Sequence, residues 1–415
     1  MKRFAAIVLC LAAWASAAVR ADDDLDRVDD ALTVTAADGR TRARVSGTFD
    51  LEGYHLSQPP PGLLFTDRDN LLNPRLSLFL DAQLGEHVYV FAQSRLDRGF
   101  DPSDDSARLR LDEYAIRLTP GGPGLNFQIG KFATVIGNWI QRHGSWENPF
   151  ITAPLPYDNL VGLWDVAAAD STATILRWAH LAPPAPAAGE YADKTRRLPV
   201  IWGPSYGTGA AVSGAVGRID YAVEVKNAAP SARPQRWAAT RGDWREPAFS
   251  GRIGGRPDEA WNLGFSASTG SYLRPEVAPA LPPGRRLNDY RQTVLGEDLA
   301  YAWHYWQLWA EIYEARFAVP RVGNADTLAY YLEAKYKFTP QFFGALRWNQ
   351  QLFASLPDAA GGSVRWGREI WRLDLAPAYR FTPHTQLKFQ YSLQHESLRS
   401  REFSHMLAAQ FTVRF

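Results

Sequence analysis

The sequence has almost no cysteine and, beyond its first residues, no long apolar run. Cys10 is the single cysteine among 415 residues. We expect it to leave with an N-terminal signal, so the remaining chain cannot form a disulfide and must be stabilised by its fold or by a membrane. No later stretch supplies the roughly 20 apolar residues of a membrane-spanning helix. The net charge is only +1, with no concentrated basic patch, so we expect no nucleic-acid partner.

The first residues have the pattern of a secretory signal peptide. Lys2 and Arg3 are followed by an apolar run over 4–13 and by small residues at Ala15-Ser16-Ala17, with a second candidate cleavage site after Ala21. We therefore predict a signal peptide over 1–21. An N-terminal membrane anchor is the alternative, but the apolar run is too short to favour it. Residues 22–42 follow as an N-terminal periplasmic extension or a hairpin of the next domain.

Aromatic residues are abundant, and apolar and polar residues alternate along many segments. The chain is 13% aromatic, with 15 Trp and 17 Tyr. In one segment Leu387, Phe389, Tyr391 and Leu393 alternate with polar residues. Segments of about ten residues with this alternation are typical of strands that face lipid on one side and a polar lumen on the other. A soluble β-sandwich also alternates, so the pattern alone does not decide.

The connections between these segments alternate in length, and that favours a barrel. We expect long connections at 55–73, 98–106, 134–204, 228–246, 272–292, 317–325, 355–366 and 397–401, and short turns near 84–87, 119–124, 217–218, 257–260, 303–304, 339–341 and 382–384. Short periplasmic turns on one rim and long extracellular loops on the other characterise transmembrane barrels. The prediction is an all-β fold, a transmembrane antiparallel β-barrel of about 16 strands over 43–415, or 18 if 22–42 contributes.

Alternation also predicts which charged side chains face the interior. A charged residue facing lipid at the membrane midplane costs roughly 2–4 kcal/mol for Arg or Lys, so these residues indicate a water-filled lumen. The slight excess of basic residues suggests a weak anion preference. The acidic candidates are Asp81, Asp97, Glu224, Glu333, Asp374 and Glu396, and the basic ones are Arg75, Arg95, Arg110, Arg252, Lys335, Arg347, Arg372, Lys388 and Arg414.

The connection at 134–204 is the longest, and it is rich in Trp, Tyr and Pro. Connections of this length are usually functional or disordered, and the composition is not that of a disordered segment. We expect it to fold into the lumen and narrow it, with Arg142 and His143 projecting toward solvent near Glu147. An extracellular cap or a trimer contact is the alternative, and Arg142 with Glu147 could be a plain surface ion pair. Residues 172–181 are a possible strand within it.

These considerations give a set of pore-lining or constriction candidates and no catalytic site. Ser145 lies near His143, but no third member or nucleophile-elbow motif accompanies them, and no metal-ligand spacing is present. We therefore predict no enzyme activity, no cofactor and no metal. The pore candidates are Lys131, Arg142, His143, Glu147, Arg347, Arg372 and Lys388.

The C-terminus resembles the assembly signal of outer-membrane barrels. Phe411, Val413 and the terminal Phe415 alternate along the last strand. The resemblance implies that the barrel-assembly machinery reads these residues and that the chain inserts into outer-membrane lipid.

A second resemblance concerns the passage into the long connection. The runs 128–132 (Gln-Ile-Gly-Lys-Phe) and 136–139 (Ile-Gly-Asn-Trp) resemble the strand-to-loop passage of Gram-negative general porins related to the phosphate-selective porin O and P family. That implies a homotrimeric, water-filled passive channel for small hydrophilic solutes in the cell outer membrane. Phosphate selectivity does not follow, because no dense series of arginines stands at matching positions.

Two other functions remain open at this stage. One is a substrate-binding channel for sugars, in which Trp139, Trp146, Trp164 and Trp202 would offer stacking surfaces. The other, less favoured, is a barrel enzyme.

Overall fold

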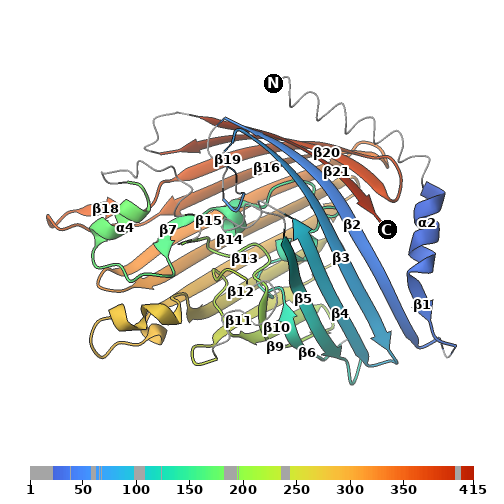
Figure 1. Ribbon diagram of the computed structural model, residues 1–415, viewed down its shortest axis with the longest axis horizontal. Helices are drawn as coiled ribbons and strands as arrows, with labels where there is room; N and C mark the ends of the chain where they lie inside the picture. The colour runs from blue at the N-terminus through green and yellow to red at the C-terminus, as the bar shows by residue number, and fades with distance from the viewer. Residues whose placement is uncertain are drawn as a thin grey trace.

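The chain forms a closed antiparallel β-barrel. The computed structural model describes residues 22–37, 39–57, 62–64, 66, 68–97, 108–122, 124–181, 194, 196–234, 244–397 and 403–415. Within these residues, sixteen strands form the barrel wall, as predicted (Figure 1). They are β2 (Thr41–Leu56), β3 (Asn70–Leu84), β4 (Val88–Asp97), β5 (Arg108–Leu118), β6 (Asn126–Phe132), β9 (Gly207–Val216), β10 (Ile219–Lys226), β11 (Ala248–Gly255), β12 (Trp261–Ser271), β13 (Arg291–Trp303), β14 (Trp306–Val319), β15 (Gly323–Lys337), β16 (Phe342–Phe353), β19 (Ile370–Arg380), β20 (Thr385–Glu396) and β21 (Ser404–Arg414). Each strand pairs with its neighbours, and β2 pairs with both β3 and β21, which closes the ring.

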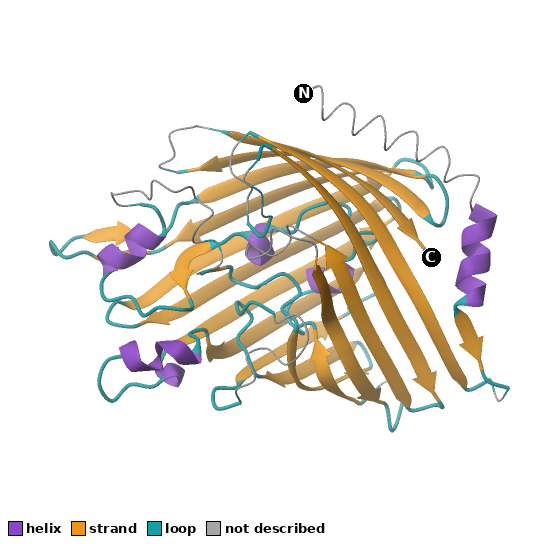
Figure 2. Ribbon diagram, viewed as in Figure 1, coloured by secondary structure: helices purple, strands orange, loops and turns teal. Residues whose placement is uncertain are grey.

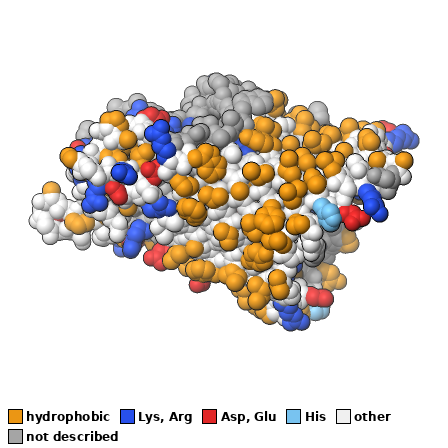
Figure 3. Space-filling model, turned by 90° about the horizontal axis from the view of Figure 1, so that it is seen from below, with side chains coloured by type: hydrophobic (Ala, Val, Ile, Leu, Met, Phe, Trp, Pro, Cys, Tyr) orange, Lys and Arg blue, Asp and Glu red, His pale blue; other side chains and the backbone are white. Residues whose placement is uncertain are grey.

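The period-two alternation divides each strand between an inner and an outer face. On β20, Lys388 and Gln390 point inward and are at most 1% exposed, whereas Tyr391 points outward and is 37% exposed. Leu387, Phe389 and Leu393 share the outer face with Tyr391. Apolar side chains form a broad band across the middle of the outer surface, with charged side chains toward its two ends (Figure 3). This distribution is that of a barrel with an apolar exterior rather than two packed sheets.

The connections separate onto two rims. The seven predicted short turns follow β3, β5, β9, β11, β13, β15 and β19, and they form the short-turn rim. The other connections, so far as the structure describes them, leave the strands at the opposite end, which we call the long-connection rim. One prediction there is wrong: the loop expected at 317–325 is a tight turn of 320–322, because the hairpin pairing continues to Val319↔Gly323. Arg321 and Gly323 adopt positive φ values of 60° and 107° to make this turn.

A short N-terminal segment lies at the short-turn rim. Helix α2 (Asp22–Ala31) leads into β1 (Thr33–Thr35), which pairs with the beginning of β2 beyond the end of β21. The Asp29 carboxylate accepts a 2.8 Å hydrogen bond from Arg44 of β2. The described residues before Thr41 thus add one short strand beside the barrel and no further wall strand. The predicted signal peptide over 1–21 lies outside the described residues.

The remaining elements belong to the connections. They are η2 (Trp139–Arg142), α3 (Leu155–Asp158), β7 (Val161–Trp164), α4 (Thr172–Trp178), β8 (Arg197–Leu198), η3 (Pro275–Ala280), η4 (Leu287–Asp289) and the hairpin of β17 (Ser355–Pro357) and β18 (Ser363–Arg365). In the described part of the chain, no helix is long and apolar enough to cross a membrane.

Helix α4 corrects the strand expected at 172–181. The backbone N–H of Thr174 donates to the Ser171 carbonyl at 3.1 Å, and the Thr174 hydroxyl donates to the Asp170 carboxylate. The backbone bond belongs to a helical turn, and the Thr174 hydroxyl bond is local as well, so this segment forms a helix rather than a strand. Because the Thr174 and Ser171 hydroxyls donate to it, the pKa of Asp170 is lowered.

Candidate functional site

The long connection between β6 and β9 is described at 133–181, 194 and 196–206, and its first part, with η2 and α3, lies inside the barrel. We call this connection the inner loop. Figure 2 shows teal loop segments and short purple helices within the ring of strands, and α4 at the long-connection end beside the β17–β18 hairpin. The backbone N–H groups of the inner loop at Asn138 and Trp139 donate to Oε1 of Glu311 at 2.6 and 2.7 Å, and the Tyr157 hydroxyl donates to Oε2 at 2.6 Å. Glu311 points inward from β14, so the loop contacts the inner wall, as predicted.

Basic side chains of three neighbouring strands hold the tip of this loop through its backbone carbonyls. Arg347 on β16 donates to the Thr152 carbonyl at 3.0 Å, and Arg372 on β19 donates to the Ala153 carbonyl at 2.5 Å. Lys388 on β20 donates to the carbonyls of Ser145, Asn148 and Phe150 at 2.7 to 3.2 Å. These three basic residues therefore secure the loop to the wall and face away from open lumen.

Carboxylates balance these buried charges. Asp374 receives hydrogen bonds from Arg347 at 2.9 Å and Arg372 at 3.3 Å. Glu333 accepts from Arg142, whose guanidinium also lies 4.2 Å from the Trp309 ring centroid. Buried ions require such partners, because desolvating them is costly. The expectation that Arg142 projects toward solvent is therefore wrong.

Apolar packing fills the space between the inner loop and the wall formed by β12 to β16. Ile136, Tyr157, Tyr313 and Phe317, all at most 1% exposed, belong to one continuous cluster. The loop is thus a packed part of the protein, and one side of the barrel interior is solid.

The tryptophans proposed to stack on sugars take part in this packing. Trp139, Trp146 and Trp202 are only 4 to 6% exposed. The ring of Trp164 stacks on Trp178 with centroids 4.7 Å apart. Trp139, Trp146 and Trp202 therefore leave little surface for a solute, and their packing gives that version of the sugar-channel hypothesis no support.

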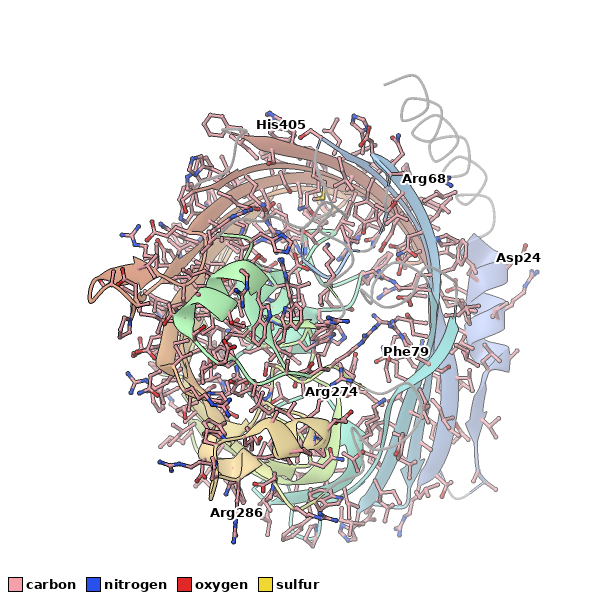
Figure 4. The ribbon with its side chains drawn as sticks, turned by 60° about the vertical axis from the view of Figure 1, so that its left-hand side comes forward. Asp24, Arg68, Phe79, Arg274, Arg286 and His405 are labelled. Atoms are coloured by element: carbon pink, nitrogen blue, oxygen red, sulfur yellow. The ribbon has the colours of Figure 1, made fainter. Side chains whose placement is uncertain are left out.

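The open part of the lumen is a cavity of about 740 Å³ between the inner loop and the inner faces of β2 to β5. From the loop it is lined by His143 and Glu147, and from the wall by Arg75, Arg95 and other inward side chains. Figure 4 looks into the barrel from the long-connection rim and shows the loop on one side of the interior. The cavity is thus the space that the inner loop leaves open beside β2 to β5.

The wall of this cavity carries a network of ion pairs. Arg75 on β3 lies 3.0 Å from Asp50 and 2.7 Å from Glu52, both on β2. Arg95 on β4 lies 3.0 Å from Asp112 on β5. Next to it, Arg110 lies 2.9 Å from Asp97. Each arginine is thus paired with a carboxylate of an adjacent strand.

A β-bulge increases the number of carboxylates on this wall. The register of β4 and β5 shifts between Gln93 and Ser94, which pair with Glu113 and Leu111. Asp112 is the extra residue, so both Asp112 and Glu113 point inward. Such bulges re-aim side chains locally, and simple alternation cannot reveal them. Asp50 and Glu52 could have been found, since they alternate within β2.

The structure places the seven pore candidates in different environments. His143 and Glu147 line the cavity. Arg142, Arg347, Arg372 and Lys388 hold the inner loop instead. Lys131 is fully buried, and its ammonium donates to the Leu111 carbonyl at 2.6 Å. Sequence alternation identified the inward residues but did not separate the open from the filled half of the interior.

The predicted basic excess is absent from the cavity itself. Five arginines line it: Arg44, Arg75, Arg95, Arg117 and Arg414. Six carboxylates accompany them: Asp29, Asp50, Asp81, Glu113, Glu147 and Asp158. This balance gives no support to an anion preference.

The C-terminal residues complete the closure of the barrel. Phe411 and Val413 pair with Leu51 and Phe49 of β2. The Phe415 N–H donates to the Gly47 carbonyl at 3.0 Å, and the Gly47 N–H donates back at 2.9 Å. A Cβ at Gly47 would lie 2.5 Å from the Phe415 ring, so a larger residue there would have to displace this ring. Recognition by the assembly machinery stays a prediction.

Fold and interior together define a closed sixteen-stranded barrel of the porin type, with an inner loop beside a cavity lined by charged side chains. Similar solved structures are OmpT of Vibrio cholerae (8% identity, TM-score 0.54, covering 92% of this chain and 100% of that one), OmpF of Salmonella typhi in complex with daunomycin (11%, 0.55, 92% and 100%) and an anion-selective porin from Comamonas acidovorans (10%, 0.53, 90% and 100%). At sequence identities this low, the structural similarity establishes the fold alone.

No family model matches the sequence, and no curated protein matches it. The resemblance of 128–139 to porins related to the phosphate-selective O and P family therefore stays a prediction.

Proposed function

We propose that the protein is an outer-membrane porin, a passive water-filled channel for small hydrophilic solutes. The observation that carries the proposal is the cavity of about 740 Å³ lined by charged side chains inside a barrel with an apolar exterior. Charged inner walls need water, and a closed barrel satisfies its backbone hydrogen bonds inside a bilayer. A signal peptide over 1–21 would direct the chain to the cell envelope.

A channel without enzyme activity fits the interior chemistry. The two ring nitrogens of His143 contact the Ile140 carbonyl and, at 3.0 Å, the Tyr206 hydroxyl. His143 is thus engaged with neighbours other than Ser145, which supports the expectation that these two residues form no catalytic arrangement. Among the structural neighbours named above, OmpT is an outer-membrane protein and the Comamonas protein is a porin, which supports a channel.

The paired charges of the cavity support weak ion selectivity. Arg75, Arg95 and Arg110 each face carboxylates of adjacent strands, so their fields largely cancel across the passage. We therefore propose a channel that admits both ions and neutral solutes, in place of the anion preference inferred from sequence.

The outer face of β13 supports assembly into a homo-oligomer, which the porin resemblance suggests is a trimer. Glu297 points outward, is exposed and, among the described residues, forms no ion pair. It stands between Phe265 and Ile312 of the neighbouring strands, six residues from the outward-facing Trp303. Six residues span about 20 Å along a strand, which places the carboxylate within an apolar band about 25 Å tall. Ionisable groups at that depth usually face protein rather than lipid, so a second copy of the chain is the proposed neighbour.

Planar-bilayer recording of the purified, folded protein tests the channel directly. We expect stepwise ohmic conductance in KCl and, in liposome-swelling assays, entry of small sugars that declines with solute size. Folding is checked independently, because barrels of this kind change their gel mobility only after heating. A folded protein that produces no conductance steps and no solute entry would refute the proposal.

A further inference from the structure

Three aromatic rings face the cavity from β3 and β4, where a porin-type wall is expected to be polar. Phe79, Tyr89 and Phe91 all line the cavity and are all partly exposed. Phe79 lies on the inner side of the wall in Figure 4. Large apolar side chains exposed on the inner wall indicate a role in binding. The outer face of the barrel could have held them without exposing them to the passage. We call these three residues the aromatic platform.

Strand register brings the three rings together. Phe79 pairs with Gln93 and Asp81 pairs with Phe91, so Phe79 and Phe91 are diagonal neighbours on one face, within reach of each other. The Tyr89 and Phe91 rings are stacked, with centroids 5.8 Å apart and planes inclined by 30°. The aromatic platform is therefore a stacked pair, Tyr89 and Phe91, with Phe79 diagonal to Phe91 on the same face.

The strand next to the aromatic platform supports its rings. Phe91 pairs with Ala115 of β5 and packs against this small side chain. The Arg117 guanidinium lies 5.7 and 5.9 Å from the Tyr89 and Phe91 ring centroids. Gln128 accepts hydrogen bonds from Nε and Nη2 of Arg117 at 3.0 and 2.8 Å. The guanidinium is thus fixed in orientation, with further N–H groups left to donate.

Polar groups surround the aromatic platform in the same cavity. The Asp81 carboxylate accepts from the Tyr89 hydroxyl. Glu113, Gln93 and Arg117 also line the cavity here. Acceptors and donors therefore stand around an apolar aromatic surface, which is the arrangement of many small-molecule sites.

We propose that the aromatic platform is a binding site for a neutral pyranose sugar in transit, a proposal that rests on the channel function above. Aromatic faces pack against the apolar C–H faces of a sugar ring, while Asp81, Glu113 and Arg117 reach its hydroxyl groups. A planar aromatic anion would also stack. It is disfavoured because two carboxylates, Asp81 and Glu113, face it against the single guanidinium of Arg117.

The test is block of the ionic current by maltotriose in planar bilayers. With the wild-type protein we expect concentration-dependent, saturable block. Phe79→Leu with Phe91→Leu retains apolar side chains but removes two aromatic faces, and should raise the half-blocking concentration about tenfold, since an aromatic pair contributes about 0.5–1.5 kcal/mol. Phe249→Leu is the matched control, because Phe249 lies on the outer face and is 50% exposed. It should change neither block nor conductance.

The outcomes separate this proposal from the channel function. Conductance without maltotriose block, or block that the double variant leaves unchanged, overturns the sugar site while the channel stands. Block by sodium benzoate but not by maltotriose overturns it in favour of an aromatic anion. A folded protein without any conductance refutes the channel itself. In that case, calorimetric titration of maltotriose into the detergent-solubilised barrel tests the sugar site separately. Absence of binding would overturn the sugar-site proposal.

Discussion

The carboxylate of Glu311 on β14 accepts the backbone N–H of Trp139 at 2.7 Å and, through the same oxygen, that of Asn138 at 2.6 Å. One wall residue thus fixes the start of the inner loop inside the barrel. With the basic residues of β16, β19 and β20 at the loop tip, it explains why the loop fills one side of the lumen and leaves the other open.

Replacing Glu311 by Ala should loosen the inner loop. Three donors, counting the Tyr157 hydroxyl, would lose their acceptor, and each unsatisfied buried donor costs about 1–3 kcal/mol. We expect the variant to unfold at a lower urea concentration and to show larger and noisier conductance steps. Glu314→Ala on the outer face of the same strand is the control and should leave the conductance unchanged. Equal behaviour of the two variants would show that Glu311 does not hold the loop.

Charge changes on the open and the filled side of the interior should have different effects. Arg95→Gln leaves Asp97 and Asp112 with less compensation on the cavity wall, so the reversal potential in a KCl gradient should shift toward cation selectivity. Lys388→Met removes a charge of the same sign behind the loop, and should lower stability with little change in selectivity. If Lys388→Met changed selectivity as much as Arg95→Gln, the open passage would have to lie elsewhere.

Deleting Phe415 should reduce assembly more than pore properties. The residue pairs with Gly47 at the barrel seam, and its resemblance to an assembly signal predicts a low outer-membrane yield in cells. The same truncated chain, refolded in detergent, is the control and should conduct as the full chain does. If the truncated chain reached the wild-type yield in cells, there would be no reason to call Phe415 part of an assembly signal.

Replacing Glu297 by Leu should weaken the oligomer. The substitution removes an outward carboxylate that lipid tolerates poorly, so the monomer gains stability in the bilayer relative to the assembly. Unheated gel electrophoresis or mass photometry in detergent measures the oligomer fraction. Leu80→Ala, on the outer face of β3, is the comparison. An oligomer that persists unchanged in Glu297→Leu would place the subunit contact on another face.

The sequence predicts the wall of this barrel much better than its interior. Alternation assigns Lys388 and Gln390 inward and Tyr391 outward, because a strand has only two faces. It cannot tell that Lys388 meets loop carbonyls while Arg95 meets open lumen, since both lie inside. The bulge at Asp112 breaks the period of two, and the contact of Glu311 with Trp139 joins residues 172 positions apart, beyond any local pattern.

The most direct test of the account is the single-channel conductance of a variant that lacks the apical part of the inner loop, around 139–156, compared with the intact protein. The structure places this segment between the filled wall and the cavity. Its removal should therefore raise the conductance and admit larger solutes while the barrel still assembles. An unchanged conductance from an assembled barrel would contradict the account, because it would mean that the inner loop does not restrict the passage.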